Sequence, residues 1–243
     1  MKEQLREVMS QFYADGVPHD MIGRAGRFPE IRNNATVIKG MRRTGKTYFT
    51  YLRMQELLAQ GIPLERLVHV NFDDDRLSAL SSENLHLLVD LHAEMFPEAA
   101  GQLCYYFLDE LQDVRGWERF ARRLVDSHRV QLCVTGSSSR MLSADIATEM
   151  RGRSVEVEIF PLSFAEYLSY NGIFREMPSL VDAPRVRGKL RKAFADYMVC
   201  GGFPDVQGLD TTTRIMLLQG YVDAVVYRDI LERHEVGSVQ SLK

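Results

Sequence analysis

Short apolar stretches alternate with segments of helical periodicity along the first two thirds of the chain. The apolar stretches have the length of strands and lie between turn-forming residues, at positions 35–39, 66–72, 104–108, 130–134 and 154–159. Between them, apolar side chains recur every three or four positions, as on one face of a helix. This alternation predicts a parallel five-stranded sheet between two layers of helices, a three-layer α/β fold.

The pattern becomes purely helical after Pro161. Ser163 and Glu166 have the spacing of a capping box, in which each side chain satisfies a backbone N–H at a helix start. No further strand is predicted beyond this point. We therefore expect an α/β domain over residues 1–160 and a small helical region over residues 161–243.

The first apolar stretch leads into a glycine-rich loop that fits the phosphate-binding pattern G-x-x-x-x-G-K-[ST] without a mismatch. Its residues are Gly40, Met41, Arg42, Arg43, Thr44, Gly45, Lys46 and Thr47. A strand precedes the loop and a helix follows it, which is the context the motif requires. In such loops backbone N–H groups surround the phosphates, Lys46 reaches the outer ones and the Thr47 hydroxyl can ligate Mg²⁺. A plain strand-to-helix turn is the weaker interpretation.

Two acidic residues, Asp109 and Glu110, follow the third apolar stretch. In P-loop enzymes a carboxylate at this strand end holds the Mg²⁺ shell, and an adjacent glutamate can polarise the attacking water. We therefore assign Asp109 to the metal and Glu110 to the general base. Together with the phosphate loop, this pair predicts a site for ATP and Mg²⁺.

Polar residues also end the fourth apolar stretch. Thr135 and Ser137 are the candidates for a side chain that faces the γ-phosphate and senses the state of the nucleotide. The alternative is that a serine of this segment caps the next helix, and one of them is expected to do so.

Composition changes this picture little. The formal charge is −3, so the chain as a whole does not attract nucleic acid or acidic membranes. A basic run at 185–192 is more often a solvated helix face, and contact with nucleic acid stays open. No apolar run approaches the ~18 residues that span a bilayer, and the charged start does not fit a signal peptide. Three unpatterned cysteines agree with a reducing compartment, so we expect a cytoplasmic protein without a membrane partner.

Eight motifs in fixed order resemble the prokaryotic AAA-type P-loop ATPases that carry a C-terminal domain of unknown function. They are GMRRTGKT at 40–47, NFDDDRL at 71–77, FLDELQ at 107–112, TGSSS at 135–139, RGR at 151–153, FPLSFAE at 160–166, GGFP at 201–204 and YRD at 227–229. The resemblance covers nearly the whole chain. One departure is Tyr48, at a position where a small or hydroxyl residue is common in the family.

The resemblance implies an additional-strand fold, binding of ATP and Mg²⁺, and ATP hydrolysis. It also implies that the chain continues beyond Lys243, through a winged-helix segment into a nuclease-like α/β domain. The apolar side of the last helix, at about 211–234, agrees with this expectation because it reaches close to the end of the sequence.

Two arginines, Arg151 and Arg153, stand between the helix after the sensing strand and the fifth apolar stretch. In AAA-type ATPases an arginine in this position points into the site of a neighbouring subunit, which would make the working unit a homo-oligomer. The alternative is an ion pair with Glu149, Glu156 or Glu158. The sequence leaves both interpretations open.

Three functions compete. The first is a Mg²⁺-dependent ATPase whose cycle moves the helical region or a downstream domain. The second is a nucleotide-binding switch with negligible turnover, and the third is a P-loop kinase. The kinase is least favoured because the helical region after Pro161 offers no obvious arginine-rich lid.

Overall fold

The computed structural model describes residues 1–19, 21–29, 31, 33–137, 150, 152–174 and 184–225. The chain divides into two compact units. The first comprises Met1–Met41 and Gly45–Ile159, and the second comprises Arg42–Thr44 and Phe160–Lys243. The helix predicted before Met150 lies outside the described residues, as does the part of the last predicted helix after residue 225.

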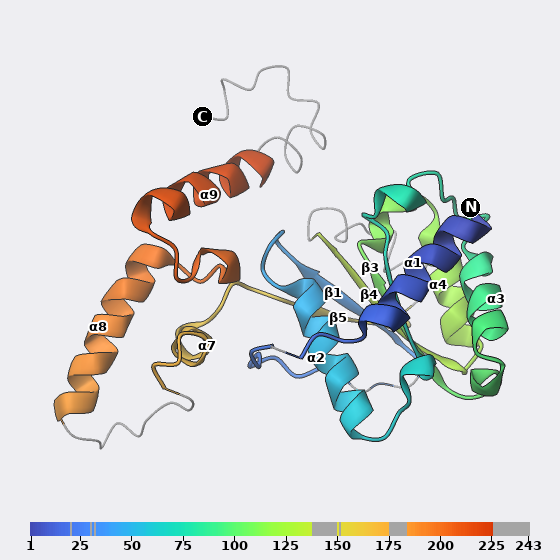
Figure 1. Ribbon diagram of the computed structural model, residues 1–243, viewed down its shortest axis with the longest axis horizontal. Helices are drawn as coiled ribbons and strands as arrows, with labels where there is room; N and C mark the ends of the chain where they lie inside the picture. The colour runs from blue at the N-terminus through green and yellow to red at the C-terminus, as the bar shows by residue number, and fades with distance from the viewer. Residues whose placement is uncertain are drawn as a thin grey trace. The chain divides into compact units, whose positions relative to one another are not determined.

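Five parallel strands form the sheet of the first unit, which confirms the predicted fold class. They are β1 (Ala35–Gly40), β2 (Leu67–Asn71), β3 (Cys104–Asp109), β4 (Val130–Ser137) and β5 (Ser154–Glu158). Their order is β2-β3-β4-β1-β5, and each neighbouring pair runs parallel. Strand β4 therefore lies between β3 and β1, so the acidic strand end, the predicted sensing strand and the phosphate loop are neighbours (Figure 1).

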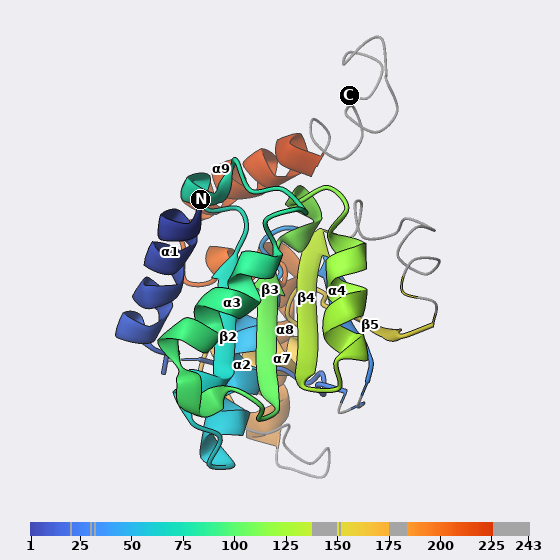
Figure 2. The same ribbon diagram turned by 90° about the vertical axis from the view of Figure 1, so that its right-hand side faces the viewer.

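Helices cover both faces of the sheet. They are α1 (Lys2–Asp15), α2 (Lys46–Ala59), α3 (His86–Met95) and α4 (Trp117–Asp126). Successive strand residues point to opposite faces, so Val37 packs in the cluster under α3 and α4 while Ile38 packs in the cluster under α2. Figure 2 shows α3 and α4 on the near side of the sheet and α2 behind it.

Helix α1 closes the β2 edge of the sheet. Its buried residues Leu5, Val8 and Met9 join the α3 and α4 cluster, and Phe12 joins the α2 cluster. The Tyr13 hydroxyl donates to the backbone carbonyl of Leu67 at 3.0 Å. The first helix of the sequence is thus part of the α/β unit.

Three helices form the described part of the second unit: α7 (Phe164–Tyr170), α8 (Pro184–Cys200) and α9 (Thr211–Ala224). The predicted capping box opens α7: the Ser163 hydroxyl accepts from the Glu166 N–H, and the Glu166 carboxylate accepts from the Ser163 N–H at 2.7 Å. Tyr167, Leu168 and Ala193 are among the residues that form its small core.

A tight backbone crossing joins α7 to the turn after α8. The Leu162 N–H donates to the Gly202 carbonyl at 2.6 Å. A side chain at Gly202 would place its Cβ 2.3 Å from the Leu162 carbonyl oxygen, so only glycine fits there. Helix α9 begins at the cap Asp210 and contains no buried residue, and its Ile215 and Val222 are exposed.

No helix in the described part of the chain combines the length and apolar character needed to cross a membrane. All three cysteines belong to the described residues, where each is a buried thiol. Burial and the charge of Asp109 raise the pKa of Cys133 well above its usual value, so this thiol is a core residue rather than a reactive one.

Candidate nucleotide-binding site

The carboxyl ends of β1, β3 and β4 meet at one edge of the sheet. Gly40 at the end of β1 is in register with Ser137 of β4, and Leu108 of β3 is in register with Val134. Because all strands are parallel, the loop after β1 and the acidic pair at the end of β3 emerge on the same side. The fold therefore brings together the motifs that the sequence singled out.

A chain of hydrogen bonds links the start of α2 to the ends of β3 and β4. The Thr47 hydroxyl donates to Asp109 Oδ2 at 2.6 Å, and the Thr135 hydroxyl donates to Asp109 Oδ1. Asp109 and Thr135 are both almost fully buried, at 2% and 1% exposure. Two hydroxyl groups therefore donate to this buried carboxylate.

Mg²⁺ fits this arrangement. It prefers carboxylate and hydroxyl oxygens, and one of each lies at the junction of the phosphate loop and β3. Thr47 and Asp109 are the residues that would hold the ion. Their 2.6 Å contact places the two oxygens next to each other.

Lys46 lies beside Glu110 in the same cluster. Its ammonium group is 3.5 Å from Glu110 Oε1 and donates to the Met41 carbonyl at 3.2 Å. The Lys46 side chain is only 5% exposed. A buried lysine with one longer ion-pair contact is available to an incoming phosphate, because phosphate oxygens would supply the negative charge that burial demands.

Glu110 adopts an unusual backbone conformation. Its φ of 53° lies in the left-handed region that side chains rarely adopt. Its N–H donates to the Thr135 hydroxyl at 3.2 Å, and its Oε2 accepts from Gln112 Nε2 at 2.5 Å. Backbone strain of this kind concentrates at functional sites, where surrounding contacts hold it.

The charge of Asp109 raises the pKa of neighbouring side chains. Burial, and after it the Asp109 carboxylate, raises the pKa of Tyr51 to about 12. Tyr51 and Cys133 lie on the α2 side of the sheet, so both remain protonated there at neutral pH. Neither of these two neighbours adds a negative charge beside Asp109 at neutral pH.

The other predicted residues lie as follows. Gly45 has a φ of 90° and begins α2, as a loop that turns sharply into a helix requires. Arg42, Arg43 and Thr44 group with the second unit, within which Arg43 Nη1 lies 3.2 Å from Asp205.

Ser137 ends β4, and its side chain lies outside the described residues, as does Arg151. Arg153 is half exposed and pairs with Asp126 at the end of α4. Among the described residues it forms no ion pair with Glu156 or Glu158, and Glu149 lies outside them. Because residue 153 precedes β5, it stands at the amino ends of the strands, where Asp126 comes from a different element.

Gln112 was missed by the sequence analysis as a member of this site. It belongs to a short 3-10 turn, Leu111–Asp113, in which buried Leu111 anchors the backbone. The turn brings its carboxamide back to Glu110, two residues earlier. A glutamine directly after an acidic strand end is the signal that could have identified it.

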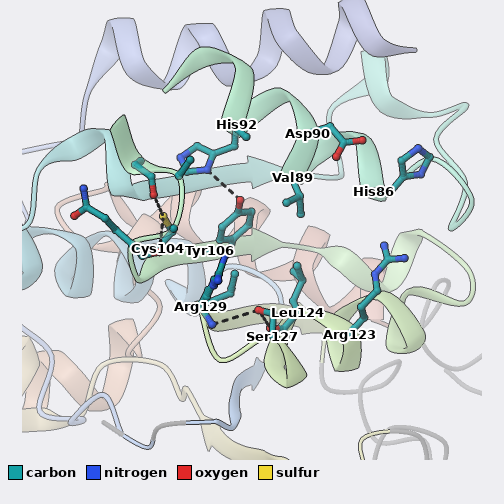
Figure 3. Close-up of a pocket in the computed structure, with 16 residues that line it drawn as sticks. His86, Val89, Asp90, His92, Cys104, Tyr106, Arg123, Leu124, Ser127 and Arg129 are labelled. Carbon is teal, nitrogen blue, oxygen red and sulfur yellow. Dashed lines mark hydrogen bonds between the residues drawn. The ribbon is translucent and has the colours of Figure 1, made fainter. Parts of the chain in front are cut away.

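A groove beside the sheet lies elsewhere in the first unit. It has a volume of about 480 Å³ and opens between α3 and α4, at the amino ends of β3 and β4 (Figure 3). His92 Nε2 lies 2.7 Å from the Glu65 carbonyl, so this nitrogen carries the proton, and Nδ1 accepts from the Tyr106 hydroxyl at 3.1 Å. Both of these polar groups are satisfied within the protein. Charged side chains, Asp90 and Arg123 among them, also line the groove (Figure 3).

A parallel sheet with a phosphate loop after β1 and an acid at the end of β3 defines the class of P-loop nucleotide-binding proteins. The sequence also matches the family described as “AAA domain” over residues 32–168. The chain belongs to this AAA family, which confirms the AAA-type resemblance of its motifs. Membership supports a nucleotide-binding, ATPase-like function.

Two curated relatives share most of the chain. The uncharacterized protein MJ1544 of Methanocaldococcus jannaschii is 32% identical over 215 residues, which cover 88% of this chain and 45% of that protein. An uncharacterized protein of Haemophilus influenzae is 31% identical over 208 residues, covering 85% and 48%. The chain thus spans about half the length of the curated relatives it matches.

Several solved structures are similar at low sequence identity. Orc1 of Aeropyrum pernix, solved in complex with DNA, is 16% identical with a TM-score of 0.45 and coverage of 93% of this chain and 60% of that chain. PCH-2 of C. elegans is 16% identical with a TM-score of 0.44 and coverage of 80% and 55%. AMPPCP-bound DnaA from Aquifex aeolicus is 16% identical with a TM-score of 0.42 and coverage of 83% and 59%.

Proposed function

We propose that the chain is a Mg²⁺-dependent ATPase whose cycle moves the helical unit, or a domain after it, relative to the nucleotide. The observation that carries this proposal is the contact of Thr47 with Asp109 at 2.6 Å, with Glu110 directly beside it. Within one cluster, Lys46 would then bind phosphate, Thr47 and Asp109 would bind the metal, and Glu110 would activate water. Membership of the AAA family supports the same conclusion.

Lys46 would bind the outer phosphates, together with the N–H groups of residues 40–47 and the positive end of α2. Binding would draw the ammonium group away from Glu110, since phosphate oxygens are the stronger partner. Mg²⁺, held by Thr47 and Asp109, would neutralise charge on the phosphates. The protein contributes to catalysis by holding these residues in position around the phosphates and the metal.

Glu110 would act as the general base. It would accept a proton from a water molecule, whose oxygen then forms a bond to the γ-phosphorus while the bond to the ADP oxygen breaks. Thr135 would report the nucleotide state, because its hydroxyl contacts both Asp109 and the Glu110 N–H. Ser137, Arg151 and a neighbouring copy of the chain stay candidates for further contacts with the γ-phosphate.

One observation favours a second function, a nucleotide-binding switch with negligible turnover. The Glu110 carboxylate is already engaged by Lys46 and by Gln112. If nucleotide did not release it, the site would bind ATP and leave it intact. Turnover, rather than binding, separates the two functions.

The test measures ATP affinity and phosphate release for three proteins: the parental chain, Lys46→Ala and Glu110→Gln. We expect Lys46→Ala to lose ATP binding, and Glu110→Gln to bind ATP normally while turnover falls about 100-fold or more. Lys189→Ala and Glu98→Gln are matched controls, because both residues are exposed. Added DNA and a longer form of the protein are further arms of the same assay.

Two results would contradict the proposal. Turnover of Glu110→Gln at the parental rate would remove Glu110 as the base. Tight ATP binding without phosphate release by the parental chain would favour the switch.

A further inference from the structure

The Glu110 carboxylate has two partners of unequal length. Gln112 Nε2 donates to Oε2 at 2.5 Å, whereas Lys46 Nζ lies 3.5 Å from Oε1. The shorter contact comes from a residue that has no part in phosphate binding. When phosphates attract Lys46, the contact with Gln112 is the one that remains.

The orientation of the Gln112 carboxamide is fixed by its partner. A carboxylate only accepts hydrogen bonds, so the amide must present its NH₂ group to Glu110 and turn its oxygen away. That oxygen, Gln112 Oε1, is buried and has no hydrogen-bond partner among the described residues. Leaving a buried acceptor unpaired destabilises the folded chain, a loss that a glutamine serving only the fold would not need to carry.

The backbone around the pair is held at both ends. The Glu110 N–H is bound to the Thr135 hydroxyl, and buried Leu111 fixes the following turn. The rotatable part of Glu110 is therefore its side chain, and Gln112 is the group that restrains it.

We propose that Gln112 is a positioning residue that keeps the Glu110 carboxylate in place for water activation after Lys46 has turned to the phosphates. This inference rests on the proposed ATPase function and extends it by one residue. Gln112 acts through Glu110, so its loss should lower kcat and leave ATP affinity unchanged.

Two substitutions with side chains of similar length test the positioning role of Gln112. Gln112→Met keeps the shape and removes the donor, and Gln112→Glu replaces the donor by a carboxylate that repels Glu110. We expect kcat to fall about 10-fold in Gln112→Met and about 100-fold in Gln112→Glu, since a small misplacement of a catalytic group has effects of this size. ATP affinity should stay within twofold of the parental value in both. Gln60→Met, at an exposed position after α2, is the matched control.

If Gln112 served only the fold, both variants would lower the melting temperature, but the kcat of Gln112→Glu would not fall further than that of Gln112→Met. Parental kcat in Gln112→Met, or an equal loss of kcat and of ATP affinity in both variants, would overturn the proposal.

A second measurement does not need turnover. The side-chain amide signals of Gln112, identified by their absence from the spectrum of Gln112→Met, should exchange with solvent more slowly than those of Gln60. Glu110→Ala should abolish this protection. Unprotected Gln112 signals in the parental protein would overturn the positioning contact itself. Protected signals in a protein without ATP turnover would instead overturn the proposed hydrolysis and leave the contact standing.

Discussion

At the carboxyl ends of β3 and β4, Asp109, Glu110 and Thr135 form a largely buried polar cluster, and Gln112 contributes a buried carboxamide oxygen that has no partner among the described residues. At the amino ends of the same strands, the groove under α3 holds Tyr106 and His92, whose polar atoms are paired within the protein. The two ends therefore differ in whether their buried polar side chains are fully satisfied.

This difference makes the groove the weaker candidate for chemistry. Volume measures room for a ligand, but recognition requires polar groups that gain a partner when the ligand arrives. The strand-end site has strained backbone at Glu110 and a buried lysine at 3.5 Å from its partner. The groove has a closed chain from Tyr106 through His92 to the Glu65 carbonyl, which stabilises the fold.

The largest effect is expected from Thr135→Val, which removes the hydroxyl shared by Asp109 and the Glu110 N–H. Both groups would lose a partner in a buried place, so we expect turnover to fall about 100-fold and stability to fall by about 1–3 kcal/mol. Phosphate release and urea unfolding measure the two effects. Thr135→Ser keeps the hydroxyl and should retain most activity. If Thr135→Val hydrolysed ATP at the parental rate, the strand-end cluster would have no greater role in turnover than the groove.

His69 tests whether an unpaired polar atom suffices to mark a functional site. It is buried on the edge strand β2 beside Phe12 and Tyr51, and its Nε2 has no partner among the described residues. Burial lowers its pKa to about 4. In the unfolded chain His69 binds a proton below about pH 6.5, whereas in the folded chain it does so only below about pH 4. The free energy of unfolding should therefore fall as pH drops from about 6.5 to about 4, by about 3 kcal/mol in total.

The measurement is urea unfolding of the parental protein and of His69→Leu across this pH range. His92 has a lowered pKa for the same reason, and it is present in both proteins. The difference between the two stability profiles therefore reports His69. A difference that does not change with pH would show that folding leaves the pKa of His69 unshifted.

Tyr106→Phe should sharpen the comparison from the side of the groove. It removes the hydroxyl that donates to His92 Nδ1 and leaves that nitrogen unpaired, so we expect a loss of about 1 kcal/mol in the free energy of unfolding. ATP turnover should stay within twofold of the parental rate. A strong loss of turnover at parental stability would mean that the groove takes part in the function.

The smallest effect is expected for Arg153→Ala. Arg153 pairs with Asp126 at a half-exposed position, and such pairs contribute roughly 0–1 kcal/mol. Turnover should therefore change less than twofold. An arginine that acts on a neighbouring subunit would instead cost about 10³-fold or more. In that case mixing Arg153→Ala with Lys46→Ala should restore activity, and this recovery would contradict the local role.

The parallel sheet could be predicted because five short apolar runs alternate with helical segments, and three of the runs end in a loop of distinct chemistry. The phosphate loop, the acids of β3 and Thr135 of β4 mark three carboxyl ends, and parallel strands place these ends together. The capping box at Ser163 was also readable, because a local hydrogen-bond pattern depends on spacing alone.

Contacts between distant side chains could not be predicted in the same way. The Asp126 partner of Arg153 comes from α4, and spacing along the sequence favoured nearer glutamates. The role of Gln112 depends on a turn that brings its carboxamide back to Glu110, and on the left-handed backbone of Glu110 itself. A non-glycine residue in that conformation carries no sequence signature.

The conformation of Glu110 has a consequence for any attempt to make this protein sturdier. A left-handed backbone at a residue with a side chain costs of order 1–3 kcal/mol, and glycine would remove most of that cost. Selection for thermal stability alone would thus favour replacement of Glu110 by glycine. That replacement would remove the carboxylate on which turnover is proposed to depend. Robustness and reactivity compete at this one position, so improvements in the first are better sought elsewhere in the chain.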